Sequence, residues 1–136
     1  MNRQSISQTL ESLPALSLHG WGVDSHSFAS NEDALASFEQ GRQMLLESEV
    51  LSGICQLLTG VRHSARIEVR AHSYSLKGLF DCALGVYCSE GEVILAVVHL
   101  GYRWERVGAS ARFAMSMDDL ELIRKRLPPS RPYDWW

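Results

Sequence analysis

Four residues in the second half of the chain have side chains that zinc accepts as ligands: His72, Cys82, Cys88 and His99. A structural zinc site usually contains a close Cys-x-x-Cys pair, and the spacing of these residues includes none. Cys82 and His99 also lie in apolar runs, where such residues are more often part of an ordinary core. We therefore expect neither a metal ion nor another cofactor.

Nucleophilic catalysis would need a hydroxyl or thiol beside a base. His63-Ser64 and His72-Ser73 are neighbours in sequence, but spatial geometry rather than adjacency makes a catalytic pair. Residues 108–112 break the G-x-S-x-G pattern at its last position, and the phosphate-binding pattern G-x-x-x-x-G-K-[ST] is absent. We expect a protein that is not an enzyme; a small enzyme with an unrecognised site is a further alternative.

Charge is distributed unevenly along the 136 residues. Residues 1–60 carry seven acidic and two basic groups, a balance of -5, and residues 61–136 carry nine acidic and eleven basic groups, a balance of +2. The sum is the net charge of -3, which argues against a dedicated binder of polyanions. Any contact with an anion or nucleic acid is therefore expected in the second half, from Lys77, Arg103, Arg106 and Arg112.

The last nine residues read Pro-Pro-Ser-Arg-Pro-Tyr-Asp-Trp-Trp, which is too rich in proline for a helix. Two exposed tryptophans would present an apolar surface that soluble monomers avoid. The segment therefore either folds back over its own core, beside Trp21, or docks on another protein or a second copy of the chain. For docking, the expected contacts are Arg131, Tyr133, Trp135 and Trp136, which include the residue types that dominate interface hot spots.

Helical patterns dominate the acidic half. Residues 4–13 suit a short helix, and residues 14–29 suit a loop with Trp21 as its one large anchor. The strongest helix is 31–59, with Ser30 as N-cap and Gly60 as a left-handed stop. A break near Gly41 would divide this segment into two helices.

The basic half mixes strands and helices. Residues 66–71 alternate strictly, which predicts a half-exposed strand with Ile67, Val69 and Ala71 facing inward. A helix over 74–84 with Ser73 as N-cap follows, and residues 102–107 and 111–115 flank a turn and form a hairpin. A helix over 117–127 is capped by Ser116, with acidic residues in its first turn and basic residues in its last.

Residues 90–100 fit two structures. Their β-branched, almost wholly apolar composition favours a strand. Ser89 and Glu92, however, have the spacing of a capping box, and Gly101 stands where a helix would stop. A helix here would be apolar all round and hence buried.

Residues 66–120 resemble a family of small uncharacterised accessory proteins of bacterial phages, plasmids and integrative elements. Residues 72–77, His-Ser-Tyr-Ser-Leu-Lys, are similar to the family's His-Ser-Tyr-Gly-Leu-Lys-His motif; residues 87–96, 101–102 and 111–116 match its later segments. The family's alanine-rich segment is helical in pattern, so the resemblance implies a helix at 90–100. Gly78 departs from the family's second histidine, and the family has no assigned activity.

These patterns predict one domain over 1–136 with an α+β, mainly helical fold and a small antiparallel sheet of 66–71, 102–107 and 111–115. Helix, turn, helix and hairpin give its C-terminal half a winged-helix-like outline, which would place residues 90–100 in a DNA groove. The function expected from the resemblance and the C-terminal segment is non-catalytic protein binding. Inhibition of a host defence system or of a toxin would belong to this class. The alternative is winged-helix-like nucleic-acid binding. Three cysteines, no apolar signal core and no run approaching ~20 apolar residues predict a cytoplasmic protein without a membrane span.

Overall fold

The structure is a computed structural model that describes residues 3–22 and 29–127. Helices dominate this part of the chain. The helices are α1 (Arg3–Glu11), α2 (Asn31–Glu47), α3 (Leu51–Leu58), α4 (Ser73–Leu84), α5 (Glu90–His99) and α6 (Met117–Lys125). The strands are β1 (Leu16–Ser17), β2 (Gly20–Trp21), β3 (His63–His72), β4 (Trp104–Val107) and β5 (Ser110–Met115). The predicted α+β, mainly helical fold is confirmed.

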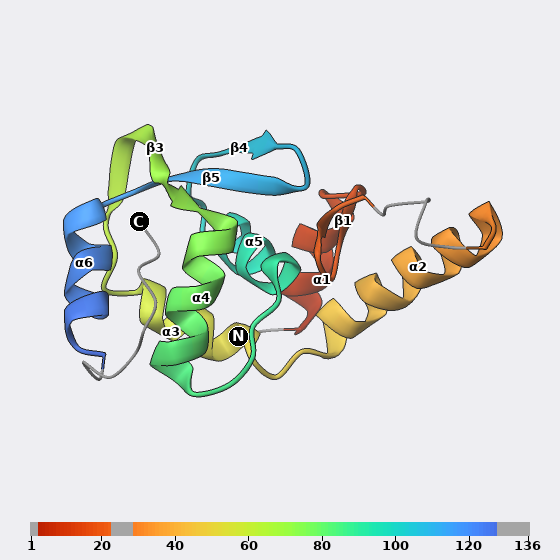
Figure 1. Cartoon of the computed structure of the whole chain (residues 1–136), viewed down its shortest axis with the longest axis horizontal. Coiled ribbons are helices and arrows are strands. Elements are labelled where there is room, and N and C mark those ends of the chain that lie inside the picture. Colours follow the sequence, from red (N-terminus) through yellow and green to blue (C-terminus); the bar gives the residue numbers. More distant parts are fainter. Residues whose placement is uncertain (1–2, 23–28, 128–136) are drawn as a thin grey trace.

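The predicted antiparallel sheet of three strands is present, in the order β3-β5-β4. Alternate residues of β5, Ala111, Phe113 and Met115, are fully buried against the helices. Figure 1 shows α4 and α5 on one side of this sheet, and the other side has no helix over it. The sequence α3, β3, α4, α5, β4, β5 follows the winged-helix-like outline expected for the C-terminal half.

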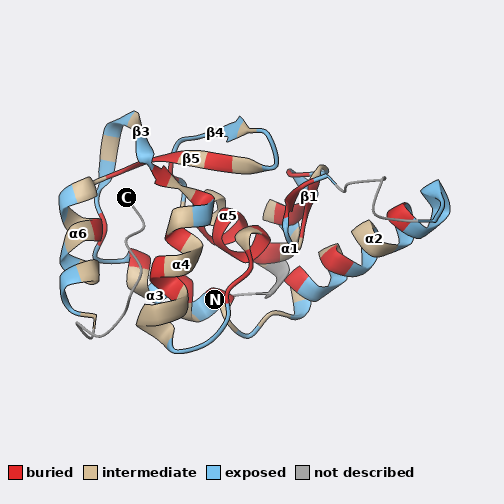
Figure 2. Ribbon diagram, in the orientation of Figure 1, coloured by how far each residue is buried: buried red, intermediate tan, exposed pale blue. Residues whose placement is uncertain are grey.

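Helix α5 lies at the centre of the structure and settles the ambiguity of residues 90–100 in favour of a helix. Ser89 and Glu92 form the complete capping box, and Gly101 has the left-handed φ of 85° that ends the segment. Seven consecutive residues, 91–97, are buried because α1, α3, α4 and the β1–β2 hairpin all pack around them. Figure 2 shows this helix as one of the most deeply buried parts of the molecule.

The β1–β2 hairpin, residues 16–21, lies within the segment predicted as a loop over residues 14–29. It fits between α2 and α5 because glycines on both helices allow its backbone to approach. A Cβ on Gly91 would lie 2.1 Å from the carbonyl oxygen of Ser17, and a Cβ on Gly41 would lie 2.2 Å from the Ser17 hydroxyl. Trp21 is buried on this hairpin, as its predicted anchor role requires.

Three local predictions are wrong. The helix predicted over 31–59 does divide in two, but at residues 48–50 rather than near Gly41, whose lack of a side chain serves packing. Gly60 has no positive φ and is not a left-handed stop. Val69 is 67% exposed rather than inward-facing, because the register of β3 against β5 shifts between Glu68 and His72.

Candidate functional site

The partner contacts predicted at Arg131, Tyr133, Trp135 and Trp136 lie outside the described residues. The structure instead shows what the motif at 72–77 does. Its members divide into a buried set that holds the fold together and an exposed set that shares one surface.

The buried members are Ser73 and Leu76, both fully inaccessible. The hydroxyl of Ser73 accepts a hydrogen bond from the amide of Ala111 at 3.0 Å and donates one to the Glu90 carboxylate at 2.7 Å. Ser110 donates to the same Glu90 oxygen at 2.8 Å. Ser73 thus joins α4, α5 and β5, and it is not the N-cap that its position suggested.

His72 is the residue that caps α4. Its Nδ1 accepts a hydrogen bond from the amide of Tyr74 at 3.2 Å. The cap sets the direction in which the helix leaves the sheet, and the Tyr74 side chain is left 66% exposed. Lys77, three residues further on, lies on the same side of the helix.

Lys77 connects α4 to the loop that leads into α5. Its Nζ lies 3.0 Å from the Asp81 carboxylate and 4.3 Å from the centroid of the Tyr87 ring. Burial would lower the pKa of Lys77, but the hydrogen bond and charge of Asp81 outweigh it and raise that pKa. Asp81 also accepts from the amide of Cys88, so the loop is fixed to the helix.

This loop presents two further apolar side chains, Val86 at 51% and Tyr87 at 61% exposure. We define the His72–Tyr87 surface by these contacts: it consists of His72, Tyr74, Lys77, Asp81, Val86 and Tyr87. The residues come from two nearby segments, positions 72–81 in and before α4 and positions 86–87 in the loop after it, and the sequence analysis identified only Lys77 among them as a contact residue. The sequence does contain one signal of this surface, because polar and aromatic residues lie together on the outer face of α4.

The arginines predicted to contact anions are on the sheet, away from the ion pair of Lys77. Arg103 precedes β4 and donates to the carbonyl of Ala65 in β3 at 2.8 Å, so its side chain crosses the central strand β5. Arg106 lies over the Trp21 ring, 5.7 Å from its centroid. In the described part of the chain neither arginine forms an ion pair.

Arg112 lies between His72 and Glu105 in the sheet register. Its Nε is buried without a hydrogen-bond partner among the described residues, and no ion pair joins Arg103, Arg106 or Arg112 to Glu68 or Glu105 there. The sheet therefore carries cations that no neighbouring carboxylate neutralises.

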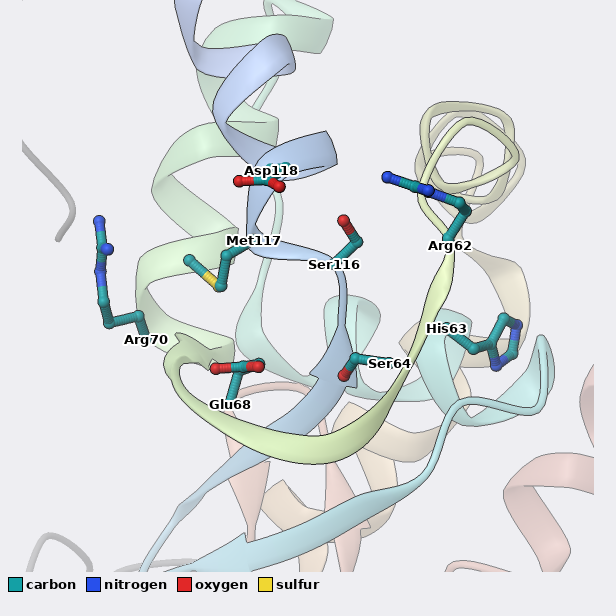
Figure 3. A pocket seen from close by; sticks show the side chains of 8 residues that line it. All are labelled: Arg62, His63, Ser64, Glu68, Arg70, Ser116, Met117 and Asp118. Carbon is teal, nitrogen blue, oxygen red and sulfur yellow. The ribbon is translucent and has the colours of Figure 1, made fainter.

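A hollow of about 610 Å³ opens between the curled β3 strand and the start of α6 (Figure 3). It is lined by Arg62, His63, Ser64, Glu68, Arg70, Ser116, Met117 and Asp118. Arg62 is held by Asp119 at 2.9 Å, and this hydrogen bond lowers the pKa of Asp119 to about 2. The lining contains two arginines and two carboxylates, so it has no predominant charge with which to select an anion or a cation.

The catalytic and metal candidates are separated from one another. His63 stacks on Tyr102 at 3.9 Å, while Ser64 donates to the Arg66 carbonyl. His99 shares a hydrogen bond with Thr9 at 2.9 Å. Over residues 3–22 and 29–127, no three His, Cys, Asp or Glu side chains are grouped to hold a metal ion.

Helix α5 does not have the exposure that groove reading requires. A recognition helix needs an outer face of polar side chains that can reach base edges, and residues 91–97 are all buried. None of the helices in the described ranges is both long and apolar enough to cross a membrane. No family model, curated protein or solved structure matches the chain.

Proposed function

We propose that this chain is a non-catalytic binding protein that docks on another protein through the His72–Tyr87 surface. The observation that carries the proposal is the exposure of Tyr74 and Tyr87, at 66% and 61%, on either side of the Lys77–Asp81 ion pair. Tyrosine is enriched in interface hot spots because its large ring has few rotamers to restrict and its hydroxyl can still form hydrogen bonds.

The rigidity of this surface supports the same function. Tyr74 follows a capped helix start, and Tyr87 is held by the contact of its ring with Lys77. A preorganised surface loses less conformational entropy on binding than mobile loops do. The structural members of the motif, Ser73 and Leu76, explain how the exposed members are kept in place.

The biological setting is part of the proposal. The resemblance of residues 66–120 to accessory proteins of bacterial mobile elements supports a role as an inhibitor of a host defence system or of a toxin. The cysteines at 55, 82 and 88 are free thiols, which supports a reducing compartment such as the cytoplasm. The C-terminal residues Arg131, Tyr133, Trp135 and Trp136 are proposed as additional partner contacts.

The test compares three forms of the tagged chain expressed in its own host. A protein that co-purifies with the wild type is identified by mass spectrometry, purified and titrated against each form. Tyr74→Ala combined with Tyr87→Ala is expected to abolish binding, and Leu35→Ala, which truncates a side chain 60% exposed on α2, is expected to leave it unchanged. Equal binding by both variants would refute docking through this surface.

Deletion of residues 130–136 tests the C-terminal contacts separately. If these residues contact the partner, the truncated chain keeps its unfolding transition and binds more weakly. Loss of the transition would instead assign them to the core of the protein.

Nucleic-acid binding is the second candidate, because Arg103, Arg106 and Arg112 have no ion pair in the described part of the chain. With α5 buried, this function is restricted to contacts with phosphate. A gel-shift titration supports it only if binding is sub-micromolar and weakens steeply as salt is raised.

A further inference from the structure

Helix α2 presents a one-sided acidic face. Glu32, Glu39 and Glu47 are spaced seven and eight residues apart, which places them on the same side of the helix with successive glutamates about 10–12 Å apart along its axis. All three are exposed, whereas Ala34, Gly41 and Leu45 form the opposite, buried side. In Figure 1 the first half of α2 extends beyond the rest of the molecule, so this face is open to a partner.

The one cation of α2 does not neutralise this face. The guanidinium of Arg42 is turned toward the end of α1, where it donates to the carbonyls of Leu13 and Leu16 at 2.8 Å and to that of Leu10 at 3.1 Å. Those carbonyls lie at and beyond the end of α1, where backbone acceptors need a donor. The acidic face, which we define as Glu32, Glu39 and Glu47, forms none of the ion pairs found among the described residues.

A face of opposite charge lies on the open side of the sheet. Arg103 crosses β5, Arg112 follows two positions away on the neighbouring strand, and Arg66 is exposed next to Ala65. We define these three residues as the arginine face. Strand spacing places Arg103 and Arg112 roughly 8 Å apart, and their long side chains can span the intervals between the glutamates of α2.

Among the described residues, the two faces lie on elements with different packing partners. Helix α2 packs on α1 and β1, whereas the arginine face belongs to β3, β5 and the start of β4. Three carboxylates along a helix about 25 Å long and three arginines on the sheet, none of them in an ion pair among the described residues, are equal in number and opposite in charge. Exposed Leu35 and Met44, at 60% and 47%, flank the acidic face and would add apolar contact.

We propose that the arginine face binds the acidic face of α2 from a second copy of this chain. A second copy is favoured over nucleic acid, because the net charge is -3 and Glu105 lies among the arginines. The contact joins two different surfaces. It gives a closed dimer when each copy binds the acidic face of the other, and an open chain of copies when the contact is made in one direction only. It is separate from the His72–Tyr87 surface and does not depend on the function proposed for that surface.

The experiment is sedimentation velocity of the full chain over a concentration series at about 0.1 M and about 1 M salt, where the Debye length falls from about 10 Å to about 3 Å. Species larger than a monomer are expected at the lower salt and are expected to dissociate at the higher. Glu39→Lys with Glu47→Lys should weaken association by about tenfold or more, since like charges then face each other. A lysine at position 47 suits the dipole at the end of α2, and position 39 is exposed, so this variant should fold.

A second variant, Arg103→Glu with Arg112→Glu, should weaken association equally. Its matched control is Lys125→Glu with Arg126→Glu, which makes the same change in net charge on α6 and should have no effect. A mixture of the two weakened variants should associate again, because both contacts between them become complementary. Recovery in the mixture also establishes that both variants are folded.

Three results overturn the proposal: a wild-type chain that is monomeric at both salt concentrations, an equal loss of association in the α6 control, or a mixture that does not recover. A monomeric chain that binds duplex DNA, with that binding lost in Arg103→Glu with Arg112→Glu, would assign the arginine face to a polyanion and equally overturn self-association.

Discussion

Gly91 and Gly53 are both glycines inside helices, and the structure predicts opposite results when each is replaced by alanine. In α3, a Cβ on Gly53 would meet the flexible end of Leu84 at 3.3 Å. In α5, a Cβ on Gly91 would meet backbone carbonyl oxygens of residues 17 and 18 at 2.1 and 2.5 Å. Only the first obstacle can move without displacing a backbone segment.

The magnitudes follow from three contributions. Replacing glycine by alanine in a helix stabilises it by about 1 kcal/mol in both variants. Gly91→Ala additionally overpacks the core, which costs about 1–3 kcal/mol, and displaces the hydrogen bond from its amide to Leu18, at 2.9 Å, which contributes about 0.5–1.5 kcal/mol. The expected net effects are a loss of about 0.5–3.5 kcal/mol for Gly91→Ala and a gain of between about 0 and 1 kcal/mol for Gly53→Ala.

Urea unfolding followed by circular dichroism measures both free energies, and a difference of about 3 kcal/mol corresponds to roughly 10 °C in Tm for a chain of this size. If the free energy of unfolding of Gly91→Ala depends less steeply on urea concentration than that of the wild type, the N-terminal hairpin has separated from α5 before global unfolding. The reasoning is refuted if Gly91→Ala is as stable as Gly53→Ala, since the hairpin could not then approach α5 as closely as described.

Three further predictions concern single side chains. Because Arg62 lowers the pKa of Asp119 to about 2, that ion pair stabilises the fold at pH values above the ordinary aspartate pKa. The difference in free energy of unfolding between wild type and Asp119→Asn, measured with urea, should therefore shrink as pH falls from about 4 toward 2. A constant difference would contradict this prediction. Burial raises the pKa of Cys88 to about 12, so a maleimide should label the half-buried Cys82 first in the native protein, as peptide mass spectrometry would show; faster labelling of Cys88 would be inconsistent with its burial. Ser89→Ala should lower the free energy of unfolding by about 0.5–2 kcal/mol through loss of the α5 cap, and an unchanged urea midpoint would argue against the capping box.

Local signals predicted the helices well because the groups that satisfy a helix end are close in sequence. Ser89 with Glu92, and Ser116 with Asp119, have the expected caps. Ser73 has the same local signal but a different role, because Ala111 and Glu90, far away in sequence, compete for its hydroxyl. Chain-distant partners of this kind cannot be read from spacing.

Tertiary contacts also explain the errors in the strands and glycines. Strict alternation placed Val69 inside, but a register shift in β3 reverses its side, and such a shift depends on pairing with β5. Gly41 and Gly53 have the same cost in a propensity scale, yet only Gly41 lies against the backbone of another element. The candidate surface was missed for a similar reason, because Tyr74 and Tyr87 are brought to it by the turn between α4 and α5.

In the winged-helix-like order of elements, the start of α5 is used for contacts within the protein rather than for contacts with DNA. Glu90 and Glu92, the charged residues at the start of α5, are each bound by serines from other segments: Ser73 and Ser110 donate to Glu90, and Ser48 donates to Glu92. The bond from Ser48 joins the acidic half to the basic half, and the bonds from Ser73 and Ser110 join α4 and β5 to the start of the apolar helix α5. The motif at residues 72–77 therefore includes residues that any chain with this arrangement would need, whatever it binds. Only the exposed tyrosines, Tyr74 and Tyr87, are free to differ with the partner, so substitutions there separate binding from folding, whereas substitutions at the buried serines cannot.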